Sequence, residues 1–308
     1  GDVEIMGGDL EIKLSRYNRV YQQGDKVEGE VTLTTKGGGI SHGGVVLKAE
    51  GAVSMQLSAN SVGLFEAFSS NIKPASLMNV SLDLLKPGKL GDGVSTLPFS
   101  IPLQPTSTNR PLLDTYHGIY ICIQYTLSVD VLKSGIFGQP MHESTEFIVE
   151  VPGKKAPPPT PQTVTLNHKD AAAKKSRGKL LEGQQFCITA HIDTTTLSIT
   201  QPLTGHVVVE TTSHAIKSIS TQLVRVETIS ATADNPTVRE ASEVQSIQCA
   251  SGSVCNNIEI PIHMVLPRLF CAPGATFQTF QLEFEINLVI EFEGGFTAVQ
   301  NWPLKVFR

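Results

Sequence analysis

The chain has 308 residues, of which 40% are hydrophobic and 17% are charged, so it is a globular protein long enough for two ordinary domains. A net charge of −5 and a pI near 5.9 oppose nucleic-acid binding, and no apolar run approaches the ~20 residues of a membrane helix. Any membrane contact is therefore expected to be peripheral. The five cysteines are odd in number, and the start GDVEIMGGDL lacks a signal-peptide core, so a reducing cytosol is expected.

Strand-like stretches follow one another in the first half of the chain. They lie at residues 26–33, 97–103, 119–131 and 146–151. In the third stretch Tyr125 and Leu127 alternate with Thr126 and Ser128, which is the period of a strand with one buried face. The glycine-rich run KGGGISHGG, residues 36–44, leads into another strand and not into a helix. It therefore predicts a flexible hairpin loop and not a phosphate-binding loop.

The composition changes at PGKKAPPPTPQ, where proline and lysine replace the alternating apolar residues. We expect an N-terminal lobe at 1–151, a linker at 152–162 and a C-terminal lobe at 163–308. The polar segment 168–179 has too small an apolar face for more than a short or frayed helical turn. The basic residues of this segment are expected either to contact anionic lipid or to face solvent. They are Lys169, Lys174, Lys175, Arg177 and Lys179.

The second half repeats the pattern of the first. Its strand-like stretches lie at residues 202–211, 258–267, 280–292 and 302–307. The same four elements recur in the same order, which indicates duplicated lobes. Period-two alternation in the long strands and the near absence of helical patterns predict an all-β fold of two tandem β-sandwiches.

Three of the five cysteines lie in the stretch QCASGSVCNNIEIPIHMVLPRLFC, residues 248–271. Zinc sites usually present close cysteine pairs, and this spacing provides none. Ile258, Ile260 and Ile262 alternate with polar residues, so His263 is expected to point away from a buried isoleucine face. The stretch predicts a β-hairpin that turns at 250–253, with the cysteines as small apolar residues.

No catalytic, cofactor or metal constellation is apparent in the sequence. No Gly-x-Ser-x-Gly elbow occurs, and the eight histidines are spread singly without ligand spacing. On one predicted strand Leu223, Arg225 and Glu227 share a face, whereas Val224 and Val226 share the other. Arg225 and Glu227 therefore form either part of a polar patch between the lobes or an ion pair at the surface.

Long stretches in both halves carry a resemblance to one family. They are RYNRVYQQGDKVEGEV (16–31), MQLSANSVGLFEAF (55–68), LKPGKL (85–90), TYHGIYICIQYTL (115–127), ITQPLTGHVVVE (199–210), QLVRVET (222–228) and IPIHMVLPRLF (260–270). With them the chain closely resembles the small, Vps26-type subunits of endosomal sorting complexes, and within that family the retriever-type branch. The resemblance implies the arrestin fold, with two β-sandwich lobes joined by a short Pro-rich linker.

The resemblance also implies a function without catalysis. In this family the small subunit binds an α-solenoid scaffold, joins a phosphoesterase-like third subunit and works with sorting nexins that recruit membrane cargo. The complex returns that cargo from the endosome to the plasma membrane. We therefore expect a cytoplasmic subunit associated peripherally with endosomes, with indirect membrane contact and no cofactor.

The resemblance places the scaffold contact near the middle of the C-terminal lobe. In the related retromer subunit an apolar pair before the glycine of a turn makes this contact, and Cys249 and Ala250 match that pair. The implied binding residues are Gln248, Cys249, Ala250, Ser251, Gly252 and Val254. The family usually has a larger apolar residue at the first position, so Cys249 predicts a smaller buried area.

Other functions compete with this interpretation. Only the resemblance favours a retriever-like subunit over a retromer-like one, because the physical properties of the sequence do not distinguish the two. A free-standing arrestin-domain adaptor usually carries Pro-Pro-x-Tyr motifs, whereas PPPTPQ lacks the tyrosine. A metal-dependent enzyme would use Cys249, Cys255, His263 and Cys271, against which the spacing and the strand facing argue.

Overall fold

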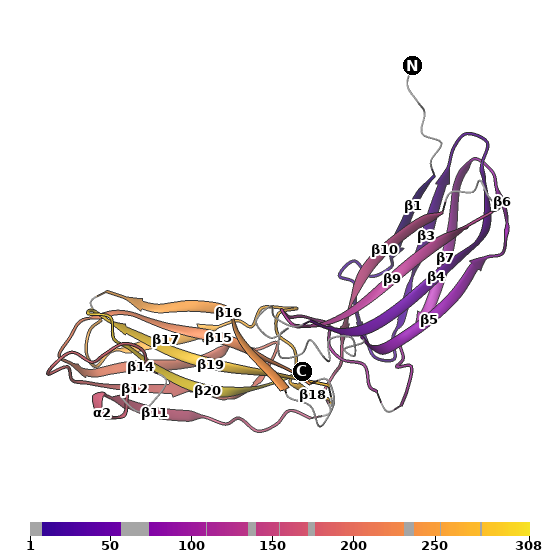
Figure 1. Cartoon of the computed structure of the whole chain (residues 1–308). Helices are drawn as coiled ribbons and strands as arrows, with labels where there is room; N and C mark the ends of the chain where they lie inside the picture. Colours follow the sequence, from indigo (N-terminus) through magenta and orange to yellow (C-terminus); the bar gives the residue numbers. More distant parts are fainter. Residues whose placement is uncertain are drawn as a thin grey trace, which may run out of the picture. The chain divides into compact units, whose positions relative to one another are not determined.

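This computed structural model describes residues 8–56, 74–108, 110–134, 140–153, 155–171, 176–230, 237–252, 254–277 and 279–308. The described residues form two compact units, with the boundary between Pro152 and Gly153. Strands make up nearly all of the regular structure in both units (Figure 1). The expected all-β class is therefore confirmed.

The first unit is a sandwich of two sheets. Its strands are β1 (Asp9–Leu14), β2 (Val20–Gln22), β3 (Lys26–Thr35), β4 (Ile40–Met55), β5 (Ala75–Leu85), β6 (Gly88–Leu90), β7 (Gly93–Pro102), β8 (Tyr116–His117), β9 (Ile121–Lys133) and β10 (Met141–Glu150). One sheet has the order β1-β3-β7. The other has the order β2-β10-β9-β4-β5, with β6 beside β4 and β8 beside β9.

The second unit has the same architecture. Its elements are β11 (Gln162–Asn167), α2 (His168–Ala171), β12 (Phe186–Ile192), β13 (Thr196–Ser198), β14 (Leu203–Thr212), β15 (Ile216–Ser230), β16 (Thr237–Ser251), β17 (Glu259–Met264), β18 (Ala275–Thr276), β19 (Phe280–Phe292) and β20 (Thr297–Phe307). The sheet orders are β11-β12-β14-β17 and β13-β20-β19-β15-β16, with β18 beside β19.

The strand orders of the two units correspond along their main paths, with β6 and β11 as the strands that have no counterpart in the described parts of the chain. The path β2-β10-β9-β4-β5 matches β13-β20-β19-β15-β16, and β1-β3-β7 matches β12-β14-β17. Each unit also has one parallel pair among its described antiparallel strands. β2 runs parallel to β10 in the first unit, and β13 runs parallel to β20 in the second. The duplication inferred from the sequence is thus confirmed in the topology.

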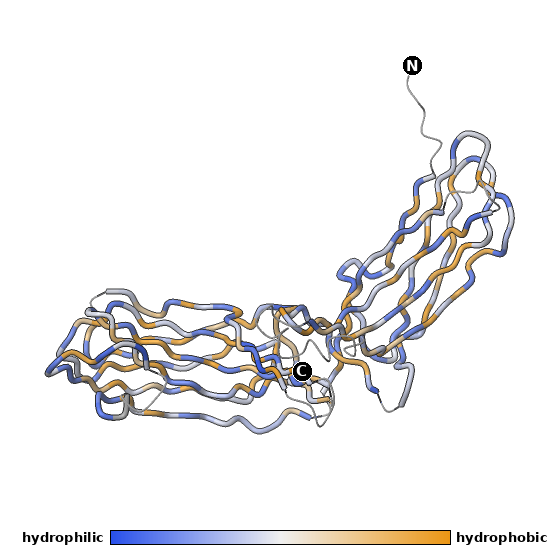
Figure 2. Tube along the Cα trace, in the orientation of Figure 1, coloured by the Kyte–Doolittle hydropathy of each residue, from blue (hydrophilic) through white to orange (hydrophobic). Residues whose placement is uncertain are grey.

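Both cores follow the predicted alternation. Tyr125, Leu127 and Val129 of β9 are fully buried, as are Leu288 and Ile290 of β19. Apolar and polar residues alternate along the strands in Figure 2. Each buried side chain of this size contributes about 1.5–3 kcal/mol through the hydrophobic effect, so the alternation drives formation of the sandwich.

The first core also contains an aromatic cluster. Tyr21 meets Phe147 edge to face at a centroid distance of 5.8 Å, and Tyr125 lies 5.8 Å from the same ring. The Tyr125 hydroxyl donates to the Leu113 carbonyl at 2.8 Å and accepts from its N–H at 3.0 Å. This buried phenol therefore has the hydrogen bonds that a polar group in a core needs.

Both predicted hairpins prove to be connections between sheets. The run 36–44 links β3 to β4, which belong to different sheets, and the Asp92 carboxylate accepts the N–H groups of Gly38 and Gly39 at 2.7–3.0 Å. The turn after Ala250 likewise links β16 to β17 of the other sheet. Period-two patterns identify strands but do not specify their partners, which is why the hairpin interpretation was wrong.

The polar segment after β11 begins with the four-residue helix α2, as the sequence predicted. Lys174 and Lys175 lie outside the described residues, as does most of the stretch 55–68. The Arg177 N–H donates to the Thr297 carbonyl at 3.0 Å, so this end of the segment is fixed to β20. No helix in the described parts of the chain is long and apolar enough to cross a membrane.

Candidate functional site

The predicted scaffold-binding residues lie along one side of the second unit. β16 is the last strand of its sheet and pairs with β15, while β17 is the last strand of the facing sheet and pairs with β14. The two edge strands are neighbours in space as well as in sequence. Backbone N–H and C=O groups on such edges remain available to a partner.

The structure separates the predicted residues by the direction of their side chains. Gln248 and Ser251 are exposed, whereas Cys249 and Ala250 are half-buried. The Cys249 thiol lies 3.4 Å from the hydroxyl of Thr221, which is only 1% exposed. Cys249 therefore faces the interior and supports the edge from behind.

A β-bulge accounts for this orientation. The register of β15 against β16 shifts between Ile219 and Ser220, which pair with Ala250 and Gln248 and leave Cys249 without a direct partner. A bulge adds one residue to a strand and re-aims its side chains. Alternation in the sequence alone cannot reveal such a shift.

Gly252 is the last residue of the edge, and its backbone conformation favours glycine. Its φ angle is +73°, in the region that L-residues rarely adopt, although a Cβ atom would meet open space. Its N–H donates to the Lys217 carbonyl at 2.9 Å, which extends the pairing beyond Ser251. Val254, the last predicted residue, is half-buried in the following turn.

Ile258 is a surface residue that the sequence interpretation assigned to the buried face. It is 56% exposed because β17 begins only at Glu259, so the alternation starts one residue later. Ile262 and Met264 are buried and His263 is exposed, as predicted. The absence of any charged residue between Glu243 and Ile258 is the sequence signal that marks this region, since interface cores are depleted in charge.

Arg225 and Glu227 are both buried, with exposed fractions of 7% and 1%. Their Nε and Oε2 atoms are 3.9 Å apart, and the Arg225 Nε also donates to the Ser242 hydroxyl at 2.8 Å. The alternative of an ion pair at the surface was therefore wrong. Their membership of a polar patch between the lobes stays a prediction.

Cys187 and Cys271 do not have the surroundings of catalytic nucleophiles. Burial raises the pKa of the Cys271 thiol to about 12, although the nearby Arg225 opposes this shift. A hydrogen bond to the Glu210 carboxylate raises the pKa of the Cys187 thiol. Both thiols are protonated at neutral pH, whereas a nucleophile must be a thiolate.

Strand pairing brings together two histidines that are far apart in sequence. His191 and His206 are directly opposite on β12 and β14, and their rings stack at a centroid distance of 5.2 Å. In the described residues no three side chains among histidine, cysteine, aspartate and glutamate are grouped to hold a metal ion. Neither histidine was singled out by the sequence, because the strand register is not readable from single residues.

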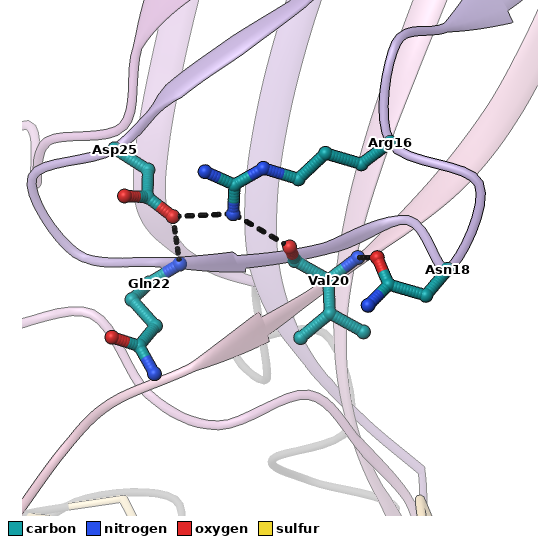
Figure 3. Close-up of polar contacts among 5 residues, drawn as sticks. All are labelled: Arg16, Asn18, Val20, Gln22 and Asp25. Atoms are coloured by element: carbon teal, nitrogen blue, oxygen red, sulfur yellow. Dashed lines mark hydrogen bonds and ion pairs between the residues drawn. The ribbon is translucent and has the colours of Figure 1, made fainter.

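The stretch 16–31, which is the first that carries the family resemblance, forms a cluster of polar contacts between β1 and β3. Arg16 donates to the Val20 carbonyl at 2.9 Å and pairs with Asp25 at 2.6 Å, and Asp25 also accepts the Gln22 N–H at 2.9 Å (Figure 3). Asn18 accepts the Val20 N–H at 3.1 Å. These bonds fix the chain around the short strand β2, so these residues serve the fold.

Two duplicated β-sandwiches with matching strand orders define a protein of the arrestin-like class. The description "Vps26: Vacuolar protein sorting-associated protein 26" belongs to the family model that matches residues 9–294, and the chain is a member of this family. It is 38% identical to vacuolar protein sorting-associated protein 26C of Dictyostelium discoideum over 309 residues, which cover 98% of the chain and 100% of that relative. The family resemblance is confirmed, and the similarity to a protein named 26C agrees with the indicated branch.

Proposed function

We propose that the chain is a non-catalytic subunit of a retriever-type complex, which returns membrane cargo from endosomes to the plasma membrane. A match to the Vps26 family along nearly the whole chain supports this assignment. In this proposal the protein works in the cytoplasm at the endosomal surface. Its partners are an α-solenoid scaffold, a phosphoesterase-like third subunit and sorting nexins that bring the cargo.

The scaffold is proposed to bind along β16 and the turn that leads to β17, from Gln248 to Ile258. The observation that supports this site is an open strand edge next to a stretch without charged residues. Gln248 and Ser251 offer polar contacts, and Ile258 offers exposed apolar area. Interfaces obtain most of their binding energy from a few such anchors, each contributing about 2 kcal/mol or more.

The inward orientation of Cys249 changes how the site is tested. A Cys249→Asp/Ala250→Asp double variant alters two half-buried positions, so lost binding would have to be separated from lost folding. Ile258→Asp places the same charge at an exposed position and leaves the core intact. Val94→Asp is its matched control, because Val94 is 67% exposed in the first unit.

The test is affinity capture from cytosol with the purified wild type and these variants, followed by mass spectrometry. The proposal predicts that the wild type and Val94→Asp retain a solenoid scaffold and that Ile258→Asp loses it. Equal capture by all the proteins would contradict the proposed edge. Capture of receptor tails or a ubiquitin ligase without a scaffold would favour a free adaptor, and a retromer scaffold would favour the retromer-like alternative.

A further inference from the structure

A second strand edge, in the first unit, is open over most of its length. β5 pairs with β4 along one side, from Val45 to Val53. On its other side the described residues supply a single backbone hydrogen bond, from the Thr106 N–H to the Leu77 carbonyl at 2.9 Å. From Asn79 to Leu85 the edge therefore has no backbone partner among the described residues.

The long edge strands of the protein differ in how they are protected. Proteins normally protect such edges with prolines, charged side chains or bulges. β7 carries Pro98 and Pro102, and β16 carries three charged side chains. β5 contains no proline, and its one charged residue is Asp83. Two register shifts against β4 are its other deviation from a regular edge.

The two faces of β5 offer different surroundings to an added strand. Val80 and Leu82 are half-buried on the inner face, whereas Asn79, Ser81 and Asp83 are exposed on the outer face. Side chains of an added strand alternate between these faces in the same way. Apolar residues would extend the core beside Val80 and Leu82, and every second residue would face the outer, polar side.

The charge on the outer face selects the polar residues of such a strand. Asp83 and Asp130 both lie opposite Val46 of β4, on its two sides. Asp130 is already paired with Lys48 at 3.1 Å and with His142 at 2.7 Å. Lys48, which lies opposite Ser81 and close to Asp83 in the register, is thus engaged by Asp130. Asp83 has no ion pair among the described residues, so its carboxylate can attract a basic residue of an incoming strand.

We propose that the β5 edge from Asn79 to Leu85 binds an extended segment of a partner protein by strand addition, with apolar residues alternating with basic ones. Backbone hydrogen bonds supply affinity in this mode of recognition, and the alternate side chains supply specificity. This site lies in the other unit from the proposed scaffold edge and does not depend on it.

The test uses two synthetic seven-residue peptides, one alternating lysine with valine and one alternating glutamate with valine. With the full chain we expect the lysine peptide to bind about tenfold more tightly, because opposite charges across strands attract and like charges repel. Hydrogen exchange should slow at alternate amides between Asn79 and Leu85. Asp83→Lys should reverse the preference, whereas Glu182→Lys, an equal charge change at an exposed turn in the second unit, should leave it unchanged.

Each other outcome overturns the proposal. Binding without protection of the β5 amides would mean adsorption by charge alone. An equal effect of Glu182→Lys and Asp83→Lys would mean that the net charge of the protein decides the preference. Absence of binding by either peptide would mean that the edge does not accept a strand.

Discussion

The Thr221 hydroxyl lies 3.4 Å from the Cys249 thiol, inside the second sandwich and behind the strand edge that we propose as the scaffold site. The same thiol contacts the Ile247 carbonyl at 3.8 Å, within its own strand. At the position where the family usually has a larger apolar residue, this chain has a small side chain that packs inward. In the proposed site we therefore expect Cys249 to hold the edge in shape and not to contact the scaffold.

Cys249→Asp should destabilise the fold by about 2 kcal/mol, because it places a carboxylate in a half-buried site beside a buried hydroxyl. Cys249→Ser should cost less than about 1 kcal/mol, since a hydroxyl can also bond to Thr221. Urea denaturation measures both values. Equal stability of Cys249→Asp and the wild type would show that the side chain points outward.

Glu227→Ala should destabilise the protein by about 3 kcal/mol, because it leaves the buried Arg225 guanidinium without this carboxylate. Glu283→Ala, at an exposed position on the neighbouring strand β19, should change the stability by less than about 0.5 kcal/mol. Thermal unfolding compares the two.

A double variant then separates the charge from the packing. Arg225→Met/Glu227→Met removes both charges and keeps similar volume, so it should recover most of the stability lost in Glu227→Ala. If the double variant is less stable than Glu227→Ala, the role of the pair lies in hydrogen bonds that methionine cannot make.

Asp92→Ala should lower the stability by about 1–2 kcal/mol, because the N–H groups of Gly38 and Gly39 lose their acceptor. Proteolysis within the run 36–44 should accelerate at the same time, since this carboxylate fixes the loop. Asp83→Ala is the matched control, and it should leave both properties unchanged. Unaltered proteolysis in Asp92→Ala would contradict this role.

The stability of the first unit should fall in acid. The Gln22 N–H and the Arg16 guanidinium hold the pKa of Asp25 below its usual range, and a hydrogen bond to His142, helped by Lys48, does the same for Asp130. A carboxyl with a lowered folded-state pKa stabilises the fold while it is ionised. This contribution is complete above the ordinary value of about 4 and is lost as the pH falls through the lower folded values.

The measurement is thermal unfolding between pH 7 and pH 3, with Asp25→Asn and Asp130→Asn beside the wild type. Each variant should show a shallower loss of stability below about pH 4, because one of the titrating groups is gone. An identical pH dependence in all three proteins would contradict the assignment.

Alternation in β9 and β19 was sufficient to predict the buried faces, because the period of a strand does not depend on its partners. The order of similar stretches was likewise sufficient to predict the duplication. The sequence could not show which strands pair with one another or in which register. The sheet to which β17 belongs, the bulge that turns Cys249 inward and the stack of His191 on His206 all depend on register, which is set by contacts between distant strands.

Burial of polar residues was also beyond the sequence. Arg225 and Glu227 read equally well as a surface pair, because a charge pattern does not show what covers it. Ile258 reads as a core residue by alternation, and only the start of β17 at Glu259 reveals its exposure. Ile258 lies in the proposed site, whereas Arg225 and Glu227 pair with Ser242 and Glu240, several residues along β16 from it.

The most direct test of the proposed function is the affinity of the purified protein for the purified solenoid scaffold, measured by calorimetry for the wild type, Ile258→Asp and Val94→Asp. The proposal predicts that Ile258→Asp binds about 30-fold or more weakly, since losing an anchor costs about 2 kcal/mol and a buried unpaired charge adds to this. Val94→Asp should bind like the wild type. Wild-type affinity in a folded Ile258→Asp protein would contradict the proposed scaffold edge.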